Sequence, residues 1–202
     1  MTLLTSIFRP ESKFRAFFVS IATFAFAYGL YKGVMDNYLA EIVGMGEFDK
    51  GLSEFFRELP GFLLVFVLAG LYLFSAENIY KIGALIMLAG MTMQSLVPAT
   101  RFMVTLAIFV YSLGEHIQLG MRNTLSIQYS KEGRGGFALG IQNSVYQVGT
   151  LLGFFAVIAV FLIFGKSSSL FRPIFAASAF TAGLSISPTG KMTFGMMFSE
   201  MR

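Results

Sequence analysis

The chain has 202 residues, of which 55% are hydrophobic and only 13% are charged. Soluble domains carry about 25% charged residues, so this composition argues strongly against a soluble globular enzyme. Cysteine is absent, which excludes disulfides, thiolate catalysis and cysteine-ligated metals. The formal charge is +4, and we expect the excess of Lys and Arg to set the orientation of the chain in a membrane rather than to bind nucleic acid.

Apolar stretches recur along the whole chain and are separated by short turn-like or charged pieces. A transmembrane helix needs roughly 20 apolar residues, so this length accommodates about six spans. We predict spans over Phe14–Val34, Leu52–Phe74, Ile82–Val97, Met103–Leu125, Phe137–Phe164 and Pro173–Ser187. The predicted fold is an all-α integral membrane bundle over residues 14–187. Residues 1–13 form a cytoplasmic N-terminus and residues 188–202 a short tail.

Basic residues are unevenly distributed between the two predicted sides of the membrane. With six spans, one side receives eight of them: Arg9, Lys13, Arg15, Lys81, Lys131, Arg134, Lys191 and Arg202. The other side has four basic residues and an acidic stretch between residues 36 and 49. Because cytoplasmic loops carry the excess of Lys and Arg, we expect a cell (inner) membrane protein with both termini in the cytoplasm.

Charged residues inside the predicted spans need an explanation, because each costs about 2.5–3.5 kcal/mol on insertion scales. Asp36 follows Lys32 by four residues at the end of the first span, where an interfacial position accounts for both. Near the start of the second span, Arg57 lies three residues after Glu54 and next to Glu58, so pairing lowers the cost of burial. For Arg57 and Glu58, an interfacial position and a functional role are equally open.

The fourth span carries the strongest candidates. Glu115 lies near its middle, Arg122 follows on the same face two turns later, and His116 is the single histidine of the chain. A carboxylate beside an imidazole in a low-dielectric environment has the parts that a proton relay needs. The alternative is a structural network in which Glu115 pairs with a basic residue of another span. We favour a functional role for Glu115 and Arg122 and leave both interpretations open for His116.

The fifth span has amides on one face, where Asn143, Gln147 and Thr150 are aligned. A helix that faced lipid would not carry these groups, so they face protein or a water-filled cavity. Spans one, two, four and five have polar faces, whereas spans three and six lack them and are expected at the periphery. The sequence therefore predicts a polar cavity lined by four helices, which suggests a path for a solute.

This order of polar and apolar spans resembles the N-terminal half of a major facilitator superfamily transporter. In that family, the first, second, fourth and fifth spans of each six-span half line a central cavity. Two stretches are similar as well: Leu59–Leu64, at the entry of the second span, and Gly133–Ile141, at the start of the fifth. Gly140, Gly149 and Gly153 have the G-x8-G-x3-G spacing of the family's antiporter motif, and such small residues allow close helix packing.

Three positions depart from the family's motifs. Phe154 replaces the proline that usually follows the third glycine, and Phe74 stands at the position of an aspartate after the second span. In the fourth span, His116 precedes Gly120 by four residues, where an arginine is usual.

The resemblance implies a secondary active transporter of a small solute that works by alternating access, with proton coupling left open. The candidate residues for binding the solute or a proton are Glu115, His116, Arg122, Asn143, Gln147, Arg57, Glu58 and Asp36. One half forms one wall of a cavity, so we expect a truncated carrier whose partners are the lipid bilayer and either a missing C-terminal half or a second copy. No cofactor is implied.

Two other classes of function are alternatives to transport. An intramembrane hydrolase would need an activated serine beside a histidine, and the sequence shows no G-x-S-x-G, no H-E-x-x-H and no evident serine partner for His116. We therefore expect neither an enzyme nor a metal site. A non-transporting remnant or accessory subunit is the alternative that the altered motifs favour.

Overall fold

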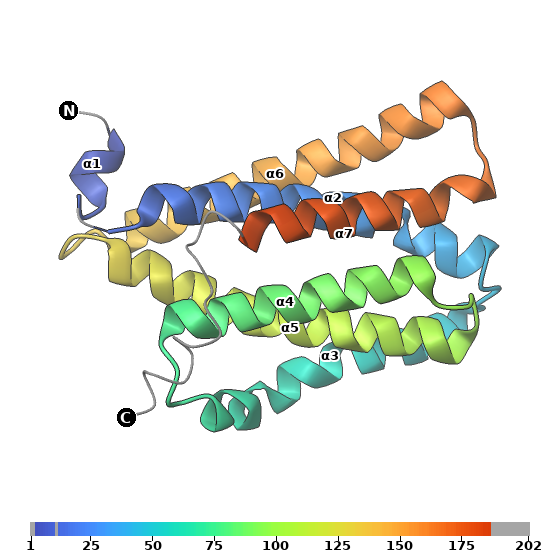
Figure 1. The fold of residues 1–202 in the computed structure, drawn as a ribbon, viewed down its shortest axis with the longest axis horizontal. Coiled ribbons are helices and arrows are strands. Elements are labelled where there is room, and N and C mark those ends of the chain that lie inside the picture. The colour runs from blue at the N-terminus through green and yellow to red at the C-terminus, as the bar shows by residue number, and fades with distance from the viewer. Residues whose placement is uncertain (1–2, 11, 187–202) are drawn as a thin grey trace.

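The computed structural model describes residues 3–10 and 12–186, and these residues are all-α. These residues form six long helices, which run roughly along one direction in Figure 1. Their bounds are α2 (Phe14–Glu41), α3 (Glu47–Gly70), α4 (Ala76–Leu96), α5 (Arg101–Tyr129), α6 (Gly135–Phe164) and α7 (Phe171–Ile186). A short helix, α1 (Leu3–Ile7), precedes them, and a 3-10 turn, η1 (Ser168–Leu170), leads into α7. The predicted tail and the last residue of the predicted sixth span lie outside the described residues.

Each predicted span corresponds to one long helix, but several helices are longer than predicted. The helix α2 continues to Glu41 instead of ending near Val34, and α4 begins at Ala76. Lys32 is therefore more than two turns from the end of α2, and the expectation that it lies at a helix end is wrong. Glu77 and Lys81, expected in a loop, lie in the first turns of α4.

Five segments are long and apolar enough to cross a membrane: α2, α4, α5, α6 and Ser168–Ile186, which contains α7. The helix α3 is not among them, although it was predicted as the second span. Its N-terminal half is too rich in charge, since it carries Glu47, Asp49, Lys50, Glu54, Arg57 and Glu58. Of the six predicted spans, five therefore correspond to segments with the length and apolar character of a membrane span.

The helices pack as a series with α3 and α6 at its two ends. The helix α3 packs on α5, α5 on α4, α4 on α7, α7 on α2 and α2 on α6, while α5 and α6 make a smaller contact. In Figure 1, α2, α6 and α7 form one group and α3, α4 and α5 the other. The contact between α4 and α7 joins the two groups.

The prediction that the third and sixth spans lie at the periphery is wrong, because the corresponding helices α4 and α7 are packed inside the bundle. The helices α4 and α7 bury residues such as Met91 and Phe175, whereas α3 buries only Ser53 and Pro60. Small residues explain the close approach of α4 and α5, because a Cβ added at Gly114 would lie 2.5 Å from the Met87 nitrogen. The most exposed helices of the described chain are α3 and α6.

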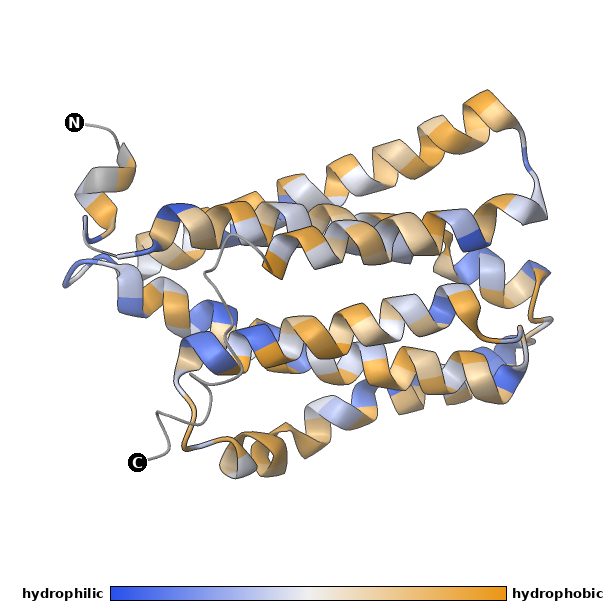
Figure 2. Ribbon diagram, in the orientation of Figure 1, coloured by the Kyte–Doolittle hydropathy of each residue, from blue (hydrophilic) through white to orange (hydrophobic). Residues whose placement is uncertain are grey.

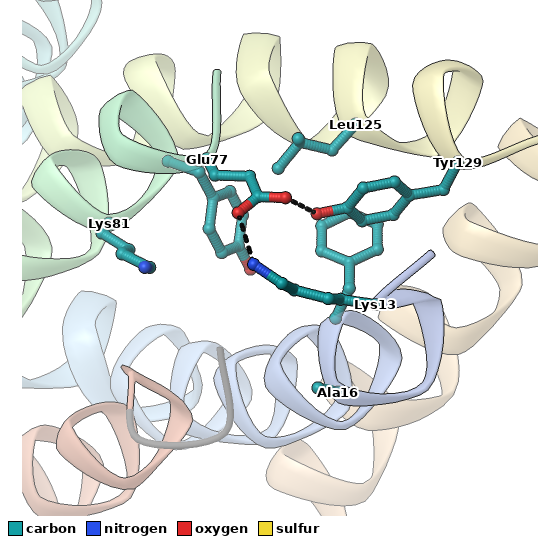
Figure 3. Close-up of a pocket in the computed structure, with 8 residues that line it drawn as sticks. Lys13, Ala16, Glu77, Lys81, Leu125 and Tyr129 are labelled. Atoms are coloured by element: carbon teal, nitrogen blue, oxygen red, sulfur yellow. Dashed lines mark hydrogen bonds and ion pairs between the residues drawn. The ribbon is translucent and has the colours of Figure 1, made fainter. Parts of the chain in front are cut away.

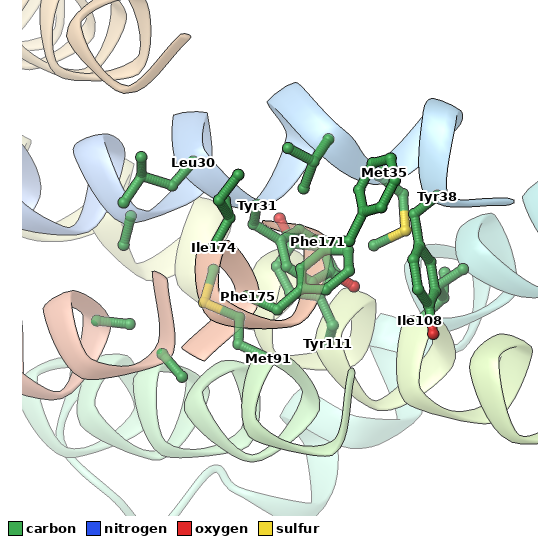
Figure 4. Close-up of a cluster of buried hydrophobic side chains, with 14 of the residues drawn as sticks. Leu30, Tyr31, Met35, Tyr38, Met91, Ile108, Tyr111, Phe171, Ile174 and Phe175 are labelled. Atoms are coloured by element: carbon green, nitrogen blue, oxygen red, sulfur yellow. The ribbon is translucent and has the colours of Figure 1, made fainter. Parts of the chain in front are cut away.

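The main apolar cluster lies among α2, α4, α5 and α7 (Figure 4). The rings of Tyr31 and Tyr111 stack with their centroids 4.3 Å apart, and Phe175 lies 5.5 Å from Tyr31. Aromatic pairs in these geometries add to the stability from buried area. The hydroxyl of Tyr31 has no hydrogen-bond partner among the described residues.

The contact between α2 and α6 depends on two of the three glycines with the antiporter-motif spacing. A Cβ added at Gly149 would lie 2.8 Å from the Ala22 oxygen, and one at Gly153 would lie 2.5 Å from the Phe26 oxygen. Gly140, expected at a helix contact as well, has open space where its Cβ would be, because that part of α6 borders grooves at the surface.

One end of the bundle gathers the N-terminal segment, the start of α4 and the end of α5 (Figure 3). Lys13 Nζ lies 3.3 Å from Glu77 Oε2, and the Tyr129 hydroxyl donates to Glu77 Oε1 over 2.6 Å. Arg9 Nε donates to the Ser130 oxygen over 3.0 Å. Since these groups satisfy one another, this small pocket is a structural junction between helices.

The opposite end is joined by Arg101, which lies 3.0 Å from Asp49 Oδ2, and by Arg172, whose side chain donates to the Val97 oxygen over 3.1 Å. Figure 2 shows mostly apolar colour along the helices and many hydrophilic residues near the two ends. Of the eight basic residues predicted on one side, Lys191 and Arg202 lie outside the described residues.

Candidate functional site

Polar side chains inside the bundle form two clusters. The first, called the ion-pair cluster, has these members on α2, α3 and α5: Lys32, Glu54, Arg57, Glu58, Ser112, Glu115 and His116. The second, called the Arg122 cluster, has these members on α5 and α6: Gln118, Arg122, Ser126, Gln142 and Tyr146.

Arg57 is the centre of the ion-pair cluster. Its Nε donates to Glu54 Oε2 over 2.6 Å, and its terminal nitrogen pairs with Glu58. The pairing with Glu54 three residues earlier was anticipated from the spacing, and the helix brings the two side chains to one face. Glu58 also extends the cluster to α5, since its Oε2 lies 3.6 Å from His116 Nε2.

His116 is oriented by Ser112, one turn earlier on α5. The histidine Nδ1 lies 2.9 Å from the Ser112 carbonyl oxygen and 3.1 Å from its hydroxyl oxygen. The Ser112 hydroxyl donates to the Arg57 carbonyl oxygen, so both contacts are satisfied when Nδ1 carries the hydrogen. A neutral ring then presents a bare Nε2 to the carboxylate of Glu58, and this pair becomes favourable when one proton lies between them.

The expectation that His116 has no serine partner is wrong, because its Nδ1 contacts Ser112. Ser112 is nevertheless fully buried and its hydroxyl hydrogen is engaged with the Arg57 carbonyl. An activated nucleophile needs its hydroxyl directed at the base and open to a substrate. The arrangement therefore serves to join α3 to α5.

Glu115 has its cationic neighbours on other helices. The strongest electrostatic partner of its carboxylate is Lys32 of α2, followed by Arg57 of α3, and His116 is next. Arg122, placed on the same face by the sequence, is not among these partners. Glu115 and Arg122 thus form no ion pair with each other, although they share one helix and both lie near Tyr28 and Tyr146.

A small cavity between α2, α3 and α5 connects the parts of the ion-pair cluster. Lys32, Glu54 and Arg57 line it together with Tyr31 and Tyr111. Both tyrosine hydroxyls are buried; that of Tyr31 lacks a partner within the described part of the chain, whereas that of Tyr111 interacts with the Glu115 carboxylate. Cationic, anionic and hydroxyl groups therefore meet in one small cavity between apolar helices.

Arg122 is only 8% exposed and lies against the ring of Tyr146, with its guanidinium carbon 3.9 Å from the ring centroid. The Tyr146 ring in turn lies 5.7 Å from the ring of Tyr28 on α2. Arg122 has no ion pair with any carboxylate in residues 3–10 and 12–186, and its Nε has no hydrogen-bond partner there. A stacked ring reduces the cost of burying this cation but does not neutralise it.

An open groove between α5 and α6 exposes one side of the Arg122 cluster. Arg122, Asn123, Gln142 and Asn143 contribute its polar lining. Asn143, one of the predicted candidates, is exposed and lines this groove. Gln147 and Asp36 are exposed and line neither this groove nor the cavity of the ion-pair cluster.

Sequence reasoning missed several members of the clusters. Gln118 and Ser126 precede and follow Arg122 by four residues, so the helical spacing of polar residues could have identified them. Tyr28 contributes through an aromatic ring, and nothing in the spacing distinguishes it from the other tyrosines. Gln94 of α4 was also overlooked, although it is fully buried with neither side-chain atom partnered among the described residues.

Comparison with protein families gives no matching family model, and comparison with curated proteins gives no match either. The fold and its apolar helices define the chain as a multi-helix membrane protein, since five helices are long and apolar enough to cross a bilayer.

Proposed function

We propose that the chain is one half of a secondary active transporter for a small solute, built like the N-terminal half of a major facilitator superfamily carrier. The observation that carries this proposal is the gathering of charged and unpartnered polar groups between α2, α3, α5 and α6. Buried charge in a membrane bundle is costly, and it marks solute or ion pathways more often than it serves packing.

The exposed surfaces of α3 and α6 are evidence that a second helical unit forms the other wall of this pathway. Large apolar side chains such as Phe62 and Phe66 of α3 and Phe155 of α6 are exposed, and they share these helices with exposed Glu58 and Gln147. A mixed surface of this kind fits another helical unit around a polar path better than it fits lipid. Six further helices or a second copy of the chain would provide that wall.

Proton coupling is assigned to Glu115 and to the pair of His116 and Glu58. The facing atoms of this pair are separated by 3.6 Å, and one shared proton converts an unfavourable contact into an attractive one. Glu115 is attracted electrostatically to Lys32 and Arg57, and a protonated Glu115 would lose this attraction. Protonation therefore changes how α2, α3 and α5 attract one another, and such a change can bias two conformations.

The orientation follows from the basic residues at the end of the bundle that contains Lys13 and Lys131. We place this end in the cytoplasm of an inner membrane, because the excess of Lys and Arg lies there. The proposed mechanism uses no cofactor and no catalytic step.

The test is solute-driven proton movement in liposomes that contain the purified chain and an internal pH-sensing dye. The probes are glucose, alanine, choline, succinate and inorganic phosphate. We expect one class of probe to change the internal pH, and Glu115→Gln to abolish the change. Glu47→Gln is the matched control, because Glu47 is an exposed residue in the first turn of α3. Unaltered coupling in Glu115→Gln would remove Glu115 from the mechanism.

A non-transporting accessory subunit is the second candidate. The wide apolar exposure of α3 and α6 favours it, because such surfaces also bind partner membrane proteins. A folded chain that moves no probe in liposomes would support this candidate and contradict transport by the chain on its own.

A further inference from the structure

The Arg122 cluster contains more hydrogen-bond donors than acceptors. Arg122 Nε, Gln118 Nε2 and Gln142 Nε2 are buried donors without partners among the described residues, and the Ser126 hydroxyl is unpartnered as well. A guanidinium offers five N–H donors and accepts nothing, so it adds to this excess. Of these groups, Arg122 and Gln142 line the groove and can donate to a group that enters it from outside the described chain.

Arg122 also has no ion pair among the described residues. Arg57, the other arginine within the bundle, pairs with Glu54 and Glu58, whereas Arg122 contacts the ring and the hydroxyl of Tyr146 and no carboxylate of the described residues. Water in the groove could supply lone pairs, but it carries no charge that would neutralise a cation in a low-dielectric site. Only an anionic group supplies both the lone pairs and the negative charge.

The groove gives such a group access. Arg122 and Gln142 are each more than nine-tenths buried, yet both line the groove between α5 and α6, together with Asn123 and Asn143. The planar guanidinium can bind two oxygens of a carboxylate or phosphate at once, and the amides can donate to the remaining oxygens. A cationic or uncharged solute would leave these donors unpaired.

We propose that the Arg122 cluster binds the carboxylate or phosphate group of an anionic solute. The inference rests on the proposed transport function only in treating this anion as the transported solute, because binding itself needs no transport. An anionic lipid headgroup has the same chemistry, so the experiment separates the two sources.

The experiment measures binding of succinate and of inorganic phosphate to the full chain in nanodiscs made only of phosphatidylcholine. We expect at least one of these anions to bind and to raise the unfolding temperature, while succinamide, the uncharged analogue of succinate, does neither. Arg122→Gln should weaken binding by about 10- to 100-fold, the range for losing hydrogen bonds to a charged group. Arg122→Lys keeps the charge and loses the planar fork, so it should weaken binding less.

Arg134→Gln is the matched control, since Arg134 is an exposed arginine at the start of α6 and outside the groove. Equal binding by wild type and Arg122→Gln would overturn the proposal. So would stabilisation by phosphatidylglycerol nanodiscs with no response to either soluble anion, which would identify a lipid site.

Failure here and failure of the transport proposal have different signatures. Loss of anion binding in Arg122→Gln with no movement of any probe in liposomes would retain the anion site and reject transport. Movement of choline or glucose that is unchanged by Arg122→Gln would retain transport and reject the anion as the transported solute, and equal anion binding by wild type and Arg122→Gln would reject the site itself.

Discussion

The ion-pair cluster and the Arg122 cluster lie along the same helix, α5, but they balance charge in different ways. Around Arg57, the carboxylates of Glu54 and Glu58 form ion pairs on α3, and Glu58 lies 3.6 Å from His116 of α5, so we call this network closed. Around Arg122, the described residues supply an aromatic ring and amides but no carboxylate. The comparison teaches that a closed network of paired charges holds helices together, whereas an open network, in which a buried cation lacks a carboxylate, is suited to bind a ligand.

The largest expected effect comes from breaking the closed network. Arg57→Gln leaves Glu54 and Glu58 without their cation and reduces the attraction of α3 to Glu115. Removing one partner costs about 3–5 kcal/mol for a buried pair and about 0.2–1 kcal/mol for an exposed one. We expect about 2 kcal/mol, because Arg57 is 25% exposed whereas Glu54 and Glu58 are more than half exposed. Denaturant unfolding in detergent measures the loss, and Arg57→Lys should recover part of it. Unchanged stability would show that the network does not hold α3.

The next effect concerns the close contact between α2 and α6. Gly153→Ala places a Cβ 2.5 Å from the Phe26 oxygen of α2, so α2 and α6 must separate, and overpacking of this kind costs about 1–3 kcal/mol. The matched control is Gly140→Ala on the same helix, where nothing lies within 4 Å of the added Cβ. That control should gain up to about 1 kcal/mol from helix propensity. Thermal unfolding of the two variants should therefore shift in opposite directions, and equal shifts would contradict the packing of α2 on α6.

A smaller effect of opposite sign is expected at the open network. Arg122→Met replaces an unpaired buried cation with an apolar chain of similar length, so the variant should gain about 1 kcal/mol in stability. The lost contact with Tyr146 offsets part of this gain. Unfolding without added anions measures it. A loss as large as that of Arg57→Gln would mean that Arg122 has a charge partner after all.

The smallest effect is expected at the ion pair of Lys13 and Glu77. The Lys13 side chain is 66% exposed, and exposed pairs contribute about 0.2–1 kcal/mol. Lys13→Ala should therefore lower stability by roughly 0.5 kcal/mol, and the difference should shrink at high salt. Unfolding at low and high ionic strength tests this. A loss of stability that does not depend on salt would show that this pair is shielded from solvent, as Arg57 is in the ion-pair cluster.

The positions of the helices could be predicted because hydropathy and charge are local properties of the chain. Each predicted span overlaps one long helix, and five segments have the length and apolar character that a membrane requires. The exception, α3, was also visible locally, since its charges crowd the first half of the helix. Spacing along one helix likewise predicted the pair of Glu54 and Arg57.

The composition and periodicity of the sequence by itself determined an all-α membrane bundle and placed Glu115 and Arg122 on one helix. Only the tertiary structure decided that Glu115 lies near Lys32 and Arg57 while Arg122 lies against Tyr146. It also decided that Gly149 and Gly153 meet α2 while Gly140 faces open space. The reason is physical: periodicity records which residues share a helix face, but charge balance and close packing depend on the neighbouring helix, which long-range packing selects.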